Sequence, residues 1–289
     1  MRKLALLIAL LTFPLSVAAE TIRLGERWYE IALPAQPKDA PLILALHGGG
    51  GSPDSFAKAS GLARAATRAG FAVAFPAGTG GRGETLLTWN VGYCCGQAAR
   101  KDVDDIGFLK EVIKDAANRF GVDGTGVYLT GMSNGSMMAE TFAAQSPGLV
   151  RAVAGVSGSM DTRLNRVQGK IPALIIHGTA DTNVPYDGGH GASSRTRTEF
   201  SSVASVVKAF LSPWGSVRAE ASRTIDRKDD GTSVIVADYR KGGRVVLRLM
   251  TIEGGAHHWP GGRKSRKSEG RTQEIDANTE ILRFFAANP

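Results

Sequence analysis

The chain has 289 residues, of which 43% are hydrophobic and 21% charged, and its formal net charge is +8. This composition excludes a disordered or fibrous chain and predicts one globular domain with a sizeable core. Basic residues are dispersed except in the run at 261–271, which is interpreted as a solvated loop or as a weak dock for an anionic polysaccharide. No nucleic-acid-binding motif accompanies that run, so we expect no nucleic acid among the partners.

The first residues have the pattern of a secretory signal peptide. Arg2 and Lys3 precede an apolar stretch at 4–13, and small residues end at Ala19. The apolar stretch is shorter than the roughly 20 residues that a membrane-spanning helix needs. We therefore predict cleavage after Ala19, a secreted or periplasmic protein without a stable membrane anchor, and a single domain over residues 20–289.

Predicted strands alternate with predicted helices from residue 41 onward. Loose alternation predicts edge strands at 20–34, and continuous apolar runs predict buried strands at 41–51, 71–78, 150–158 and 171–181. Helices are predicted at 53–70, 102–121, 196–214 and 276–287. Residues 126–145 have the pattern of a strand, a tight turn and a helix, and a later hairpin is predicted to turn at 241–243. This order predicts an α/β fold with a mostly parallel central sheet and helices on both faces.

Three acidic residues begin the helix predicted at 102–121. Asp102, Asp104 and Asp105 lie where the positive end of the helix dipole stabilises negative charge. We interpret them as capping charges rather than as catalytic groups.

The most specific chemical signal is GMSNG, at 131–135. It matches the G-x-S-x-G pattern and lies between a predicted strand and a predicted helix, the context that a nucleophilic serine requires. A serine there projects from a strained turn at the positive end of a helix. We predict that Ser133 is a nucleophile, against the alternative of a purely structural turn.

A serine hydroxyl needs an acid and a base beside it, and on this type of fold they follow in the order acid, then histidine. Asp181 comes directly after a predicted strand, and Asp187 is a weaker rival further into the loop. This order along the chain excludes His47 and His177 as the base, because both precede the candidate acid. His190 is excluded because it follows the candidate acid too closely. The base is therefore expected in GGAHHWPGG, at His257 or His258.

Ester attack also needs hydrogen-bond donors for the oxyanion. One is expected to be the backbone N–H of Asn134, directly after the nucleophile, and the other an N–H of HGGGG at 47–51. Gly49 is the first choice there and Gly48 the second. A phosphate-binding loop is the alternative interpretation, but the stretch lacks both the P-loop ending and the dinucleotide spacing.

Six ordered motifs resemble the polyhydroxybutyrate depolymerase-like esterases, which include exported feruloyl esterases of the α/β-hydrolase superfamily. The motifs are LHGGGG, TWNVGYCCG, DDIGFLKEVI, GMSNGSMMA, HGTADTNVPY and EGGAHHWPGG, spread over roughly residues 40–285. The resemblance implies an α/β-hydrolase fold, ester hydrolysis without a cofactor or metal, and a Ser–Asp–His triad. Those roles fall on Ser133, Asp181 and one of the two adjacent histidines.

The family pattern separates the two histidines. Its last motif usually reads Gly-Gly-Gly-His-x-Trp-Pro-Gly, so the histidine of the motif corresponds to His257 and the variable position to His258. This chain departs from the pattern at Ala256, where a glycine is usual. Adjacent side chains of an extended loop point to opposite sides, so only one histidine can face Ser133. Trp259 would then share the side of His257 and is expected to line the substrate pocket.

The motif TWNVGYCCG leaves two questions open. Trp89 is interpreted either as part of the substrate-binding wall or as a core aromatic residue. Cys94 and Cys95 are the only cysteines, so they form a vicinal disulfide or stay as two thiols. Adjacent Cα atoms lie about 3.8 Å apart across a trans peptide, whereas disulfides usually need about 4.4 Å, so such a ring would be strained.

We therefore expect an exported serine carboxylic ester hydrolase that forms an acyl-enzyme. Its expected partners are small-molecule or oligomeric esters. The family resemblance implies hydroxycinnamate (feruloyl-type) esters or short polyhydroxybutyrate-type oligomers. One alternative is an acetyl esterase acting on plant-wall xylan. Another is a non-catalytic carbohydrate- or lipid-binding protein on a hydrolase scaffold. Both a monomer and a dimer are compatible with the sequence.

Overall fold

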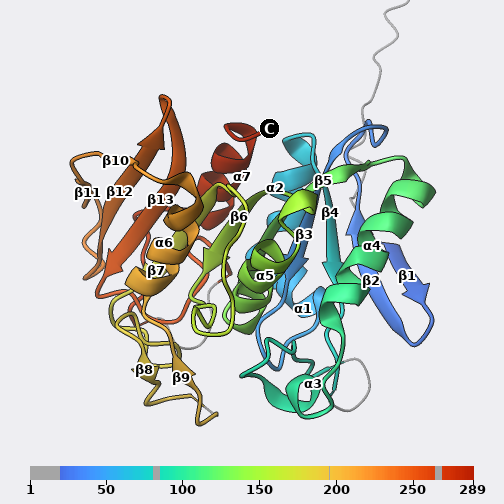
Figure 1. Cartoon of the computed structure of the whole chain (residues 1–289), viewed down its shortest axis with the longest axis horizontal. Helices are drawn as coiled ribbons and strands as arrows, with labels where there is room; N and C mark the ends of the chain where they lie inside the picture. The colour runs from blue at the N-terminus through green and yellow to red at the C-terminus, as the bar shows by residue number, and fades with distance from the viewer. Residues whose placement is uncertain (1–19, 81–84, 195, 264–268) are drawn as a thin grey trace, which may run out of the picture.

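The computed structural model describes residues 20–80, 85–194, 196–263 and 269–289 (Figure 1). The predicted signal peptide at 1–19 lies outside these residues, so its cleavage stays a prediction. No helix within the described residues has the length and apolar character needed to cross a bilayer.

One large sheet forms the centre of the molecule. Its strands follow the spatial order β1 (Glu20–Leu24), β2 (Arg27–Ala32), β4 (Ala72–Pro76), β3 (Pro41–Leu46), β5 (Asp123–Met132), β6 (Val150–Val156), β7 (Ala173–Gly178), β13 (Arg244–Glu253), β12 (Ser233–Lys241) and β10 (Arg218–Ala219), with β11 (Arg223–Ile225) also paired to β12. The six neighbours from β4 to β13 are parallel, and the flanking strands are antiparallel. The mostly parallel central sheet is therefore confirmed.

Helices cover both faces of this sheet, as predicted (Figure 1). One face packs against α4 (Asp105–Phe120), α5 (Asn134–Gln145) and α6 (Val203–Leu211), and the other against α1 (Pro53–Ser60), α2 (Leu62–Arg68) and α7 (Ala277–Ala286). Successive residues of a strand point to opposite faces. Accordingly, Leu42 and Leu44 of β3 join the first core, whereas Ile43 joins the second.

Two predicted helices differ from the observed ones. The helix predicted at 53–70 is two helices, because Gly61 takes the left-handed conformation with φ 68° and ends the first. The helix predicted at 196–214 begins only at Val203, since the Ser202 hydroxyl caps it by accepting from the N–H of Ser205. The residues before it instead form the short pair β8 (Gly189–His190) and β9 (Glu199–Phe200).

The acidic cluster before α4 has two distinct roles. Asp104 caps the helix by accepting from the N–H of Gly107 at 2.7 Å, as expected. Asp105 lies in the first turn of α4, as predicted, but its carboxylate forms an ion pair instead of capping the helix. It is buried, pairs with Arg27 of β2 at 2.6 Å, and accepts from the N–H of Asn90 at 2.7 Å. It therefore ties the loop after β4 to the edge of the sheet.

Candidate active site

The predicted catalytic residues follow the carboxyl ends of parallel strands, the edge where open α/β sheets place their sites. Ser133 follows β5, Asp181 follows β7 and His257 follows β13. Gly49 follows β3 at the same edge. This edge is the lower one in Figure 1, on the side of α3 (Gly96–Arg100) and the β8–β9 pair.

Ser133 lies in a sharp turn between β5 and α5. Its backbone has φ 56° and ψ −124°, a conformation that costs free energy in a residue with a side chain. The flanking glycines permit the turn. A Cβ on Gly131 would collide with the backbone of Gly135, and one on Gly135 would collide with the carbonyl of Leu46. The G-x-S-x-G spacing is thus a steric requirement of this strand–turn–helix junction.

The structure brings together Asp181 and His257. Nδ1 of His257 and Oδ2 of Asp181 are 2.7 Å apart, so the imidazole donates its Nδ1 proton to the carboxylate. The Asp181 side chain is buried, whereas 17% of the His257 side chain is exposed. Asp181, rather than the rival Asp187, is therefore the acid that contacts the candidate base.

Asp181 is held as an anion by several donors. Its Oδ1 accepts from the backbone N–H groups of Asn183 and Val184, each at 2.9 Å. Burial alone would raise the pKa of Asp181, but the hydrogen bonds from His257 and from the backbone N–H of Val184 lower this pKa below its ordinary value. The carboxyl group is consequently ionised at neutral pH.

Sequence reasoning excluded His177 as the base and did not predict that it lies next to the acid. The ring is fully buried, and its Nε2 is 2.8 Å from the carbonyl oxygen of Val184 and 3.5 Å from Oδ2 of Asp181. Burial lowers its pKa, so the ring is neutral and donates from Nε2. The signal was present in the motif HGTAD, where the histidine precedes the acid by four residues.

His258 points elsewhere. Its Nε2 is 3.2 Å from the carbonyl oxygen of Glu269, and its own carbonyl oxygen is 3.5 Å from the Ser157 hydroxyl. Burial lowers the pKa of His258. The adjacent histidines therefore have different surroundings, and His257 is the one that meets the acid.

The candidate oxyanion donors lie beside the nucleophile. Asn134 is the first residue of α5, so its backbone N–H has no partner in the helix. A Cβ on Gly49 would lie 3.5 Å from Cβ of Asn134, and one on Gly48 would lie 3.6 Å from Cβ of Ser133. The glycine loop after β3 thus approaches the turn closely. Its role as an oxyanion hole remains a proposal.

The Asn134 side chain has a role that the sequence did not reveal. Its Oδ1 accepts from the N–H of Trp89 at 2.8 Å, and its Nδ2 donates to the carbonyl of Trp89 at 3.1 Å. The amide therefore pairs with the backbone of the loop after β4. An apolar residue directly after Ser133 would lose both hydrogen bonds.

His47 forms hydrogen bonds that hold the glycine loop in place. Its ring is fully buried, accepts at Nε2 from the N–H of Gly78 at 3.0 Å, and donates from Nδ1 to the carbonyl of Gly48 at 2.9 Å. Burial lowers its pKa to about 4, so the ring is neutral. His47 is thus a structural residue, which agrees with its exclusion as the base.

Both tryptophans expected near substrate lie in the core. Trp89 has no exposed surface and donates from Nε1 to the carbonyl of His47 at 2.9 Å, which favours the core alternative. Trp259 is only 6% exposed, packs edge-on against Phe56 and donates to Asn278. The burial of both indoles gives no support to a substrate-binding role for Trp89 or Trp259, and that role stays a prediction.

Cys94 and Cys95 form a vicinal disulfide in the structure, across a cis peptide bond, which corresponds to the first of the two alternatives. The N–H of Cys95 donates to the carbonyl of Trp89, and the carbonyl of Cys94 accepts from the N–H of Val91. The disulfide therefore belongs to the compact loop that Asn134 holds against α5.

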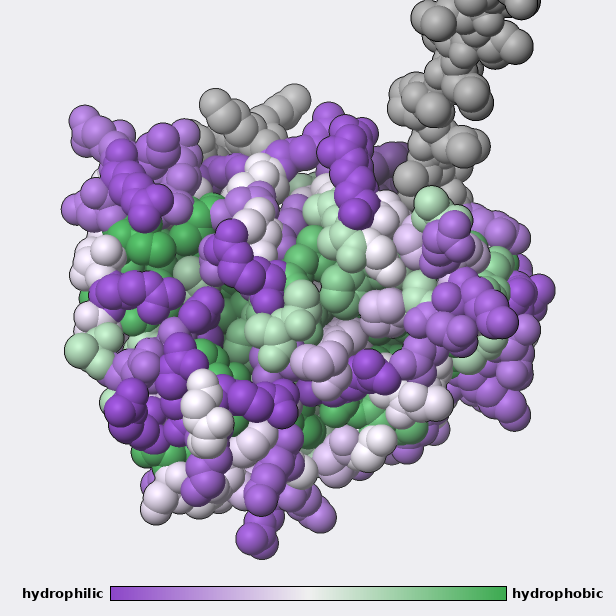
Figure 2. Space-filling model, turned by 90° about the horizontal axis from the view of Figure 1, so that it is seen from above, coloured by the Kyte–Doolittle hydropathy of each residue, from purple (hydrophilic) through white to green (hydrophobic). Residues whose placement is uncertain are grey.

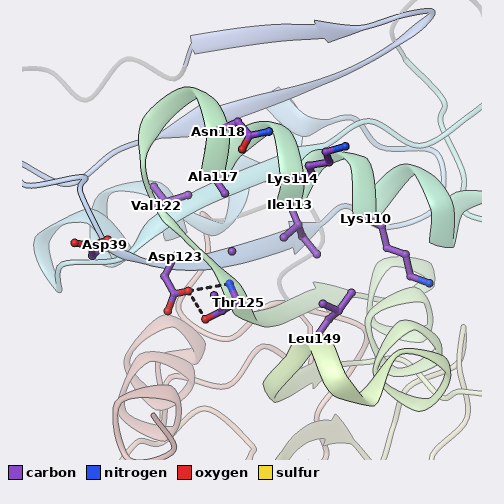
Figure 3. A pocket seen from close by; sticks show the side chains of 11 residues that line it. Asp39, Lys110, Ile113, Lys114, Ala117, Asn118, Val122, Asp123, Thr125 and Leu149 are labelled. Atoms are coloured by element: carbon purple, nitrogen blue, oxygen red, sulfur yellow. Dashed lines mark hydrogen bonds between the residues drawn. The ribbon is translucent and has the colours of Figure 1, made fainter.

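A groove of about 600 Å³, shown from close by in Figure 3, lies at the edge of the sheet where β5 begins, opposite the edge of the candidate site in Figure 1. Its lining comes from α4 and the start of β5, where Asp123 accepts from Thr125 and pairs with Arg151. Figure 2 shows this end from above, with mainly hydrophilic residues and smaller apolar areas between them. The groove contains none of the predicted catalytic residues, so it is separate from the candidate site.

Fold and site together define the class of protein. The mostly parallel sheet is covered by helices on both faces. Ser133 has a positive φ at a strand–turn–helix junction, and an Asp–His pair follows later in the chain at the same edge. This is the arrangement of an α/β hydrolase. The sequence profile described as "Esterase PHB depolymerase" matches residues 29–166, which include Ser133. The chain belongs to this esterase family.

Relatives agree with this assignment, and a solved structure has the same fold. The chain is 35% identical over 244 residues to the putative esterase NocK of Nocardia uniformis subsp. tsuyamanensis, covering 79% of this chain and 68% of that protein. It is 29% identical to feruloyl esterase B of Piromyces equi, over 76% of this chain but only 40% of that protein. The acetyl xylan esterase of Aspergillus awamori has the same fold, with a TM-score of 0.62 and 17% identity over 92% of this chain and 99% of that one.

Proposed function

We propose that the protein is a serine carboxylic ester hydrolase in which Ser133 is the nucleophile, His257 the general base and Asp181 the orienting acid. The observation that carries the proposal is the 2.7 Å contact between His257 and Asp181, at the edge where the strained Ser133 also lies. This contact fixes the tautomer, because an imidazole that donates from Nδ1 presents Nε2 as the proton acceptor.

The proposed reaction has two halves. His257 takes the proton of Ser133 while the serine oxygen attacks the ester carbonyl carbon, and the carbonyl electron pair moves onto oxygen. The N–H groups of Asn134 and Gly49 would stabilise that oxyanion. Collapse expels the alcohol, which takes the proton from His257, and leaves an acyl-enzyme. Water, deprotonated by the same histidine, then releases the acid and restores Ser133.

Replacement of the nucleophile tests this proposal. Ser133→Ala should lower kcat on p-nitrophenyl acetate by at least about 10⁴-fold and leave the thermal unfolding temperature close to that of the wild type. Ser216→Ala, at an exposed serine far along the chain, is the matched control and should keep full activity. Substantial turnover by Ser133→Ala would contradict the serine mechanism.

The substrate class is proposed from similarity. The family name and the feruloyl esterase of Piromyces equi support hydroxycinnamate esters or short hydroxybutyrate oligomers. The bifunctional acetylxylan esterase/xylanase XynS20E of Neocallimastix patriciarum, 25% identical over 56% of this chain, supports an acetyl esterase as the alternative. Parallel kcat/KM measurements on methyl ferulate, a hydroxybutyrate trimer and acetylated xylobiose would rank the three classes. Preference for the acetylated sugar would favour the alternative.

Export is part of the same proposal. The charged start, apolar stretch and small residues before Glu20 support removal of residues 1–19 by a signal peptidase. Intact mass of the protein recovered from a periplasmic or culture fraction should correspond to a chain that begins at Glu20. Recovery of the full-length chain only, in the cytoplasm, would contradict export.

A further inference from the structure

Glu140 is a buried carboxyl group on the helix that begins after Ser133. It is 1% exposed and lies among residues of α5 that are also buried. No ion pair within the described residues includes it. Burial raises its pKa to about 7. Because burying a carboxyl group without a cation costs free energy, an apolar residue would suit this position better unless the carboxyl group has a specific task.

The carboxyl group makes two hydrogen bonds. Oε2 accepts from the backbone N–H of Met160 at 2.8 Å, and Oε1 is 3.2 Å from the hydroxyl of Ser136. Met160 belongs to the segment that follows β6, at the same edge of the sheet as Ser133. We define this segment, residues 157–160, as the β6 loop. Glu140 thus fastens the β6 loop to the helix of the nucleophile.

The β6 loop packs closely against the turn that contains the nucleophile. The N–H of Ser133 donates to the carbonyl of Val156 at 2.9 Å, directly before the loop. A Cβ on Gly158 would lie 2.7 Å from the carbonyl oxygen of Ser133, so only glycine allows this approach. Ser157 adopts φ 50°, a strained conformation for a residue with a side chain. Strain of this kind persists where the surrounding contacts hold it in place.

The same loop also reaches the other half of the site. The Ser157 hydroxyl is 3.5 Å from the carbonyl oxygen of His258, next to the candidate base. Ser159 accepts at its carbonyl from the Tyr93 hydroxyl and donates from its own hydroxyl to the carbonyl of Ser201. The β6 loop therefore joins four segments around the site, and Glu140 is its buried anchor.

From these contacts we infer that Glu140 is a positioning residue for the catalytic centre. By holding the N–H of Met160, it fixes the β6 loop, and the β6 loop sets the relative placement of the Ser133 turn and the His257 segment. Glu140 does not touch substrate. The inference rests on the proposed serine mechanism, and it adds a residue that the sequence motifs do not include.

Two substitutions separate positioning from stability. Glu140→Met keeps a similar volume and removes the buried carboxyl group, but it leaves the N–H of Met160 without its acceptor. We expect it to fold and to lose about 10- to 100-fold in kcat on p-nitrophenyl acetate, with KM changed less than about twofold. Glu140→Gln still accepts from Met160 and can donate to Ser136, so kcat should return to within about threefold of the wild type.

A second readout is the rate at which a fluorophosphonate probe labels Ser133. This rate should fall in Glu140→Met in parallel with kcat, on protein that thermal unfolding shows to be folded. Glu111→Met, at an exposed position of α4, is the control and should match the wild type. If Glu140→Met folds and reacts at the wild-type rate, or if Glu140→Gln is equally impaired, the inference is wrong. If Glu140→Met does not fold, Glu140→Gln and Ser136→Ala decide, because both variants keep the acceptor of the Met160 N–H. A large loss of kcat in either variant would then contradict the inference. A wild type that is never labelled would instead overturn the proposed function.

Discussion

At the scale of single residues, the hydrogen bond between Asp181 and His257 controls which nitrogen of the imidazole accepts a proton. Asp181→Asn should keep the fold but present an amide that can donate to Nδ1, which selects the wrong tautomer. We expect kcat on p-nitrophenyl acetate to fall by roughly 10³- to 10⁴-fold while KM changes little. Asp187→Asn is the matched control and should retain activity. Equal losses in the two variants would contradict the assignment of the acid.

The adjacent histidines allow an equally direct comparison. His257→Ala removes the proposed base and should lower kcat by at least about 10³-fold. His258→Ala removes a ring whose Nε2 faces the carbonyl of Glu269, so its effect should stay within about tenfold. Steady-state kinetics on p-nitrophenyl acetate measure both. A larger loss in His258→Ala would reverse the assignment.

Glu140 predicts a pH dependence of stability with a defined sign. Burial raises the pKa of this group in the folded protein from 4.5 to about 7. Between these values the folded state holds a proton that the unfolded state has lost, so the contribution of Glu140 to stability decreases as the pH rises through this range and is constant outside it. The full decrease is on the order of 3 kcal/mol, since one pKa unit corresponds to about 1.4 kcal/mol.

Denaturant unfolding of the wild type and Glu140→Gln at pH 5 and pH 8 isolates this contribution, because the other carboxyl groups are common to both proteins. The free energy of unfolding of the wild type, relative to Glu140→Gln, should be lower at pH 8 than at pH 5. The same difference at both pH values would show that Glu140 does not titrate in this range.

At the scale of elements, the turn between β5 and α5 depends on close approach of backbones. A Cβ on Gly135 would collide with the carbonyls of Leu46 and His47, neither of which can move without shifting β3. Gly135→Ala should therefore destabilise the protein by about 3 kcal/mol or more. Gly148→Ala is the control, because a Cβ there meets nothing within 4 Å. Chemical denaturation that found the two variants equally stable would contradict the packing of this junction.

Helix boundaries show where sequence reasoning fails at this scale. Gly61 ends α1 through its left-handed conformation, although the apolar pattern continues across it. The start of α6 at Val203 is set by the cap at Ser202, while Phe200 packs edge-on against Tyr93 of a distant loop. The cap was readable in the sequence, but the packing that fixes the preceding residues was not.

At the scale of the whole molecule, the order of strands and helices was predictable because apolar runs and glycine turns alternate regularly. The placement of Ser133 and Asp181 at one edge of the sheet was predictable for the same reason, since each follows a predicted strand, whereas the preference for His257 over His258 came from the family resemblance. Contacts between distant segments were not predictable. The pairing of Asp105 with Arg27, the 3.5 Å approach of His177 to Asp181, and the burial of Trp259 depend on tertiary packing.

The central claim is that Ser133 is a nucleophile activated by the Asp181–His257 pair. The most direct measurement is labelling of the folded wild type with a fluorophosphonate probe, followed by peptide mapping by mass spectrometry. The account predicts one equivalent of probe on Ser133, none on the other serines, and much slower labelling in His257→Ala. Absence of label on Ser133 in folded protein, or labelling at an unchanged rate in His257→Ala, would contradict it.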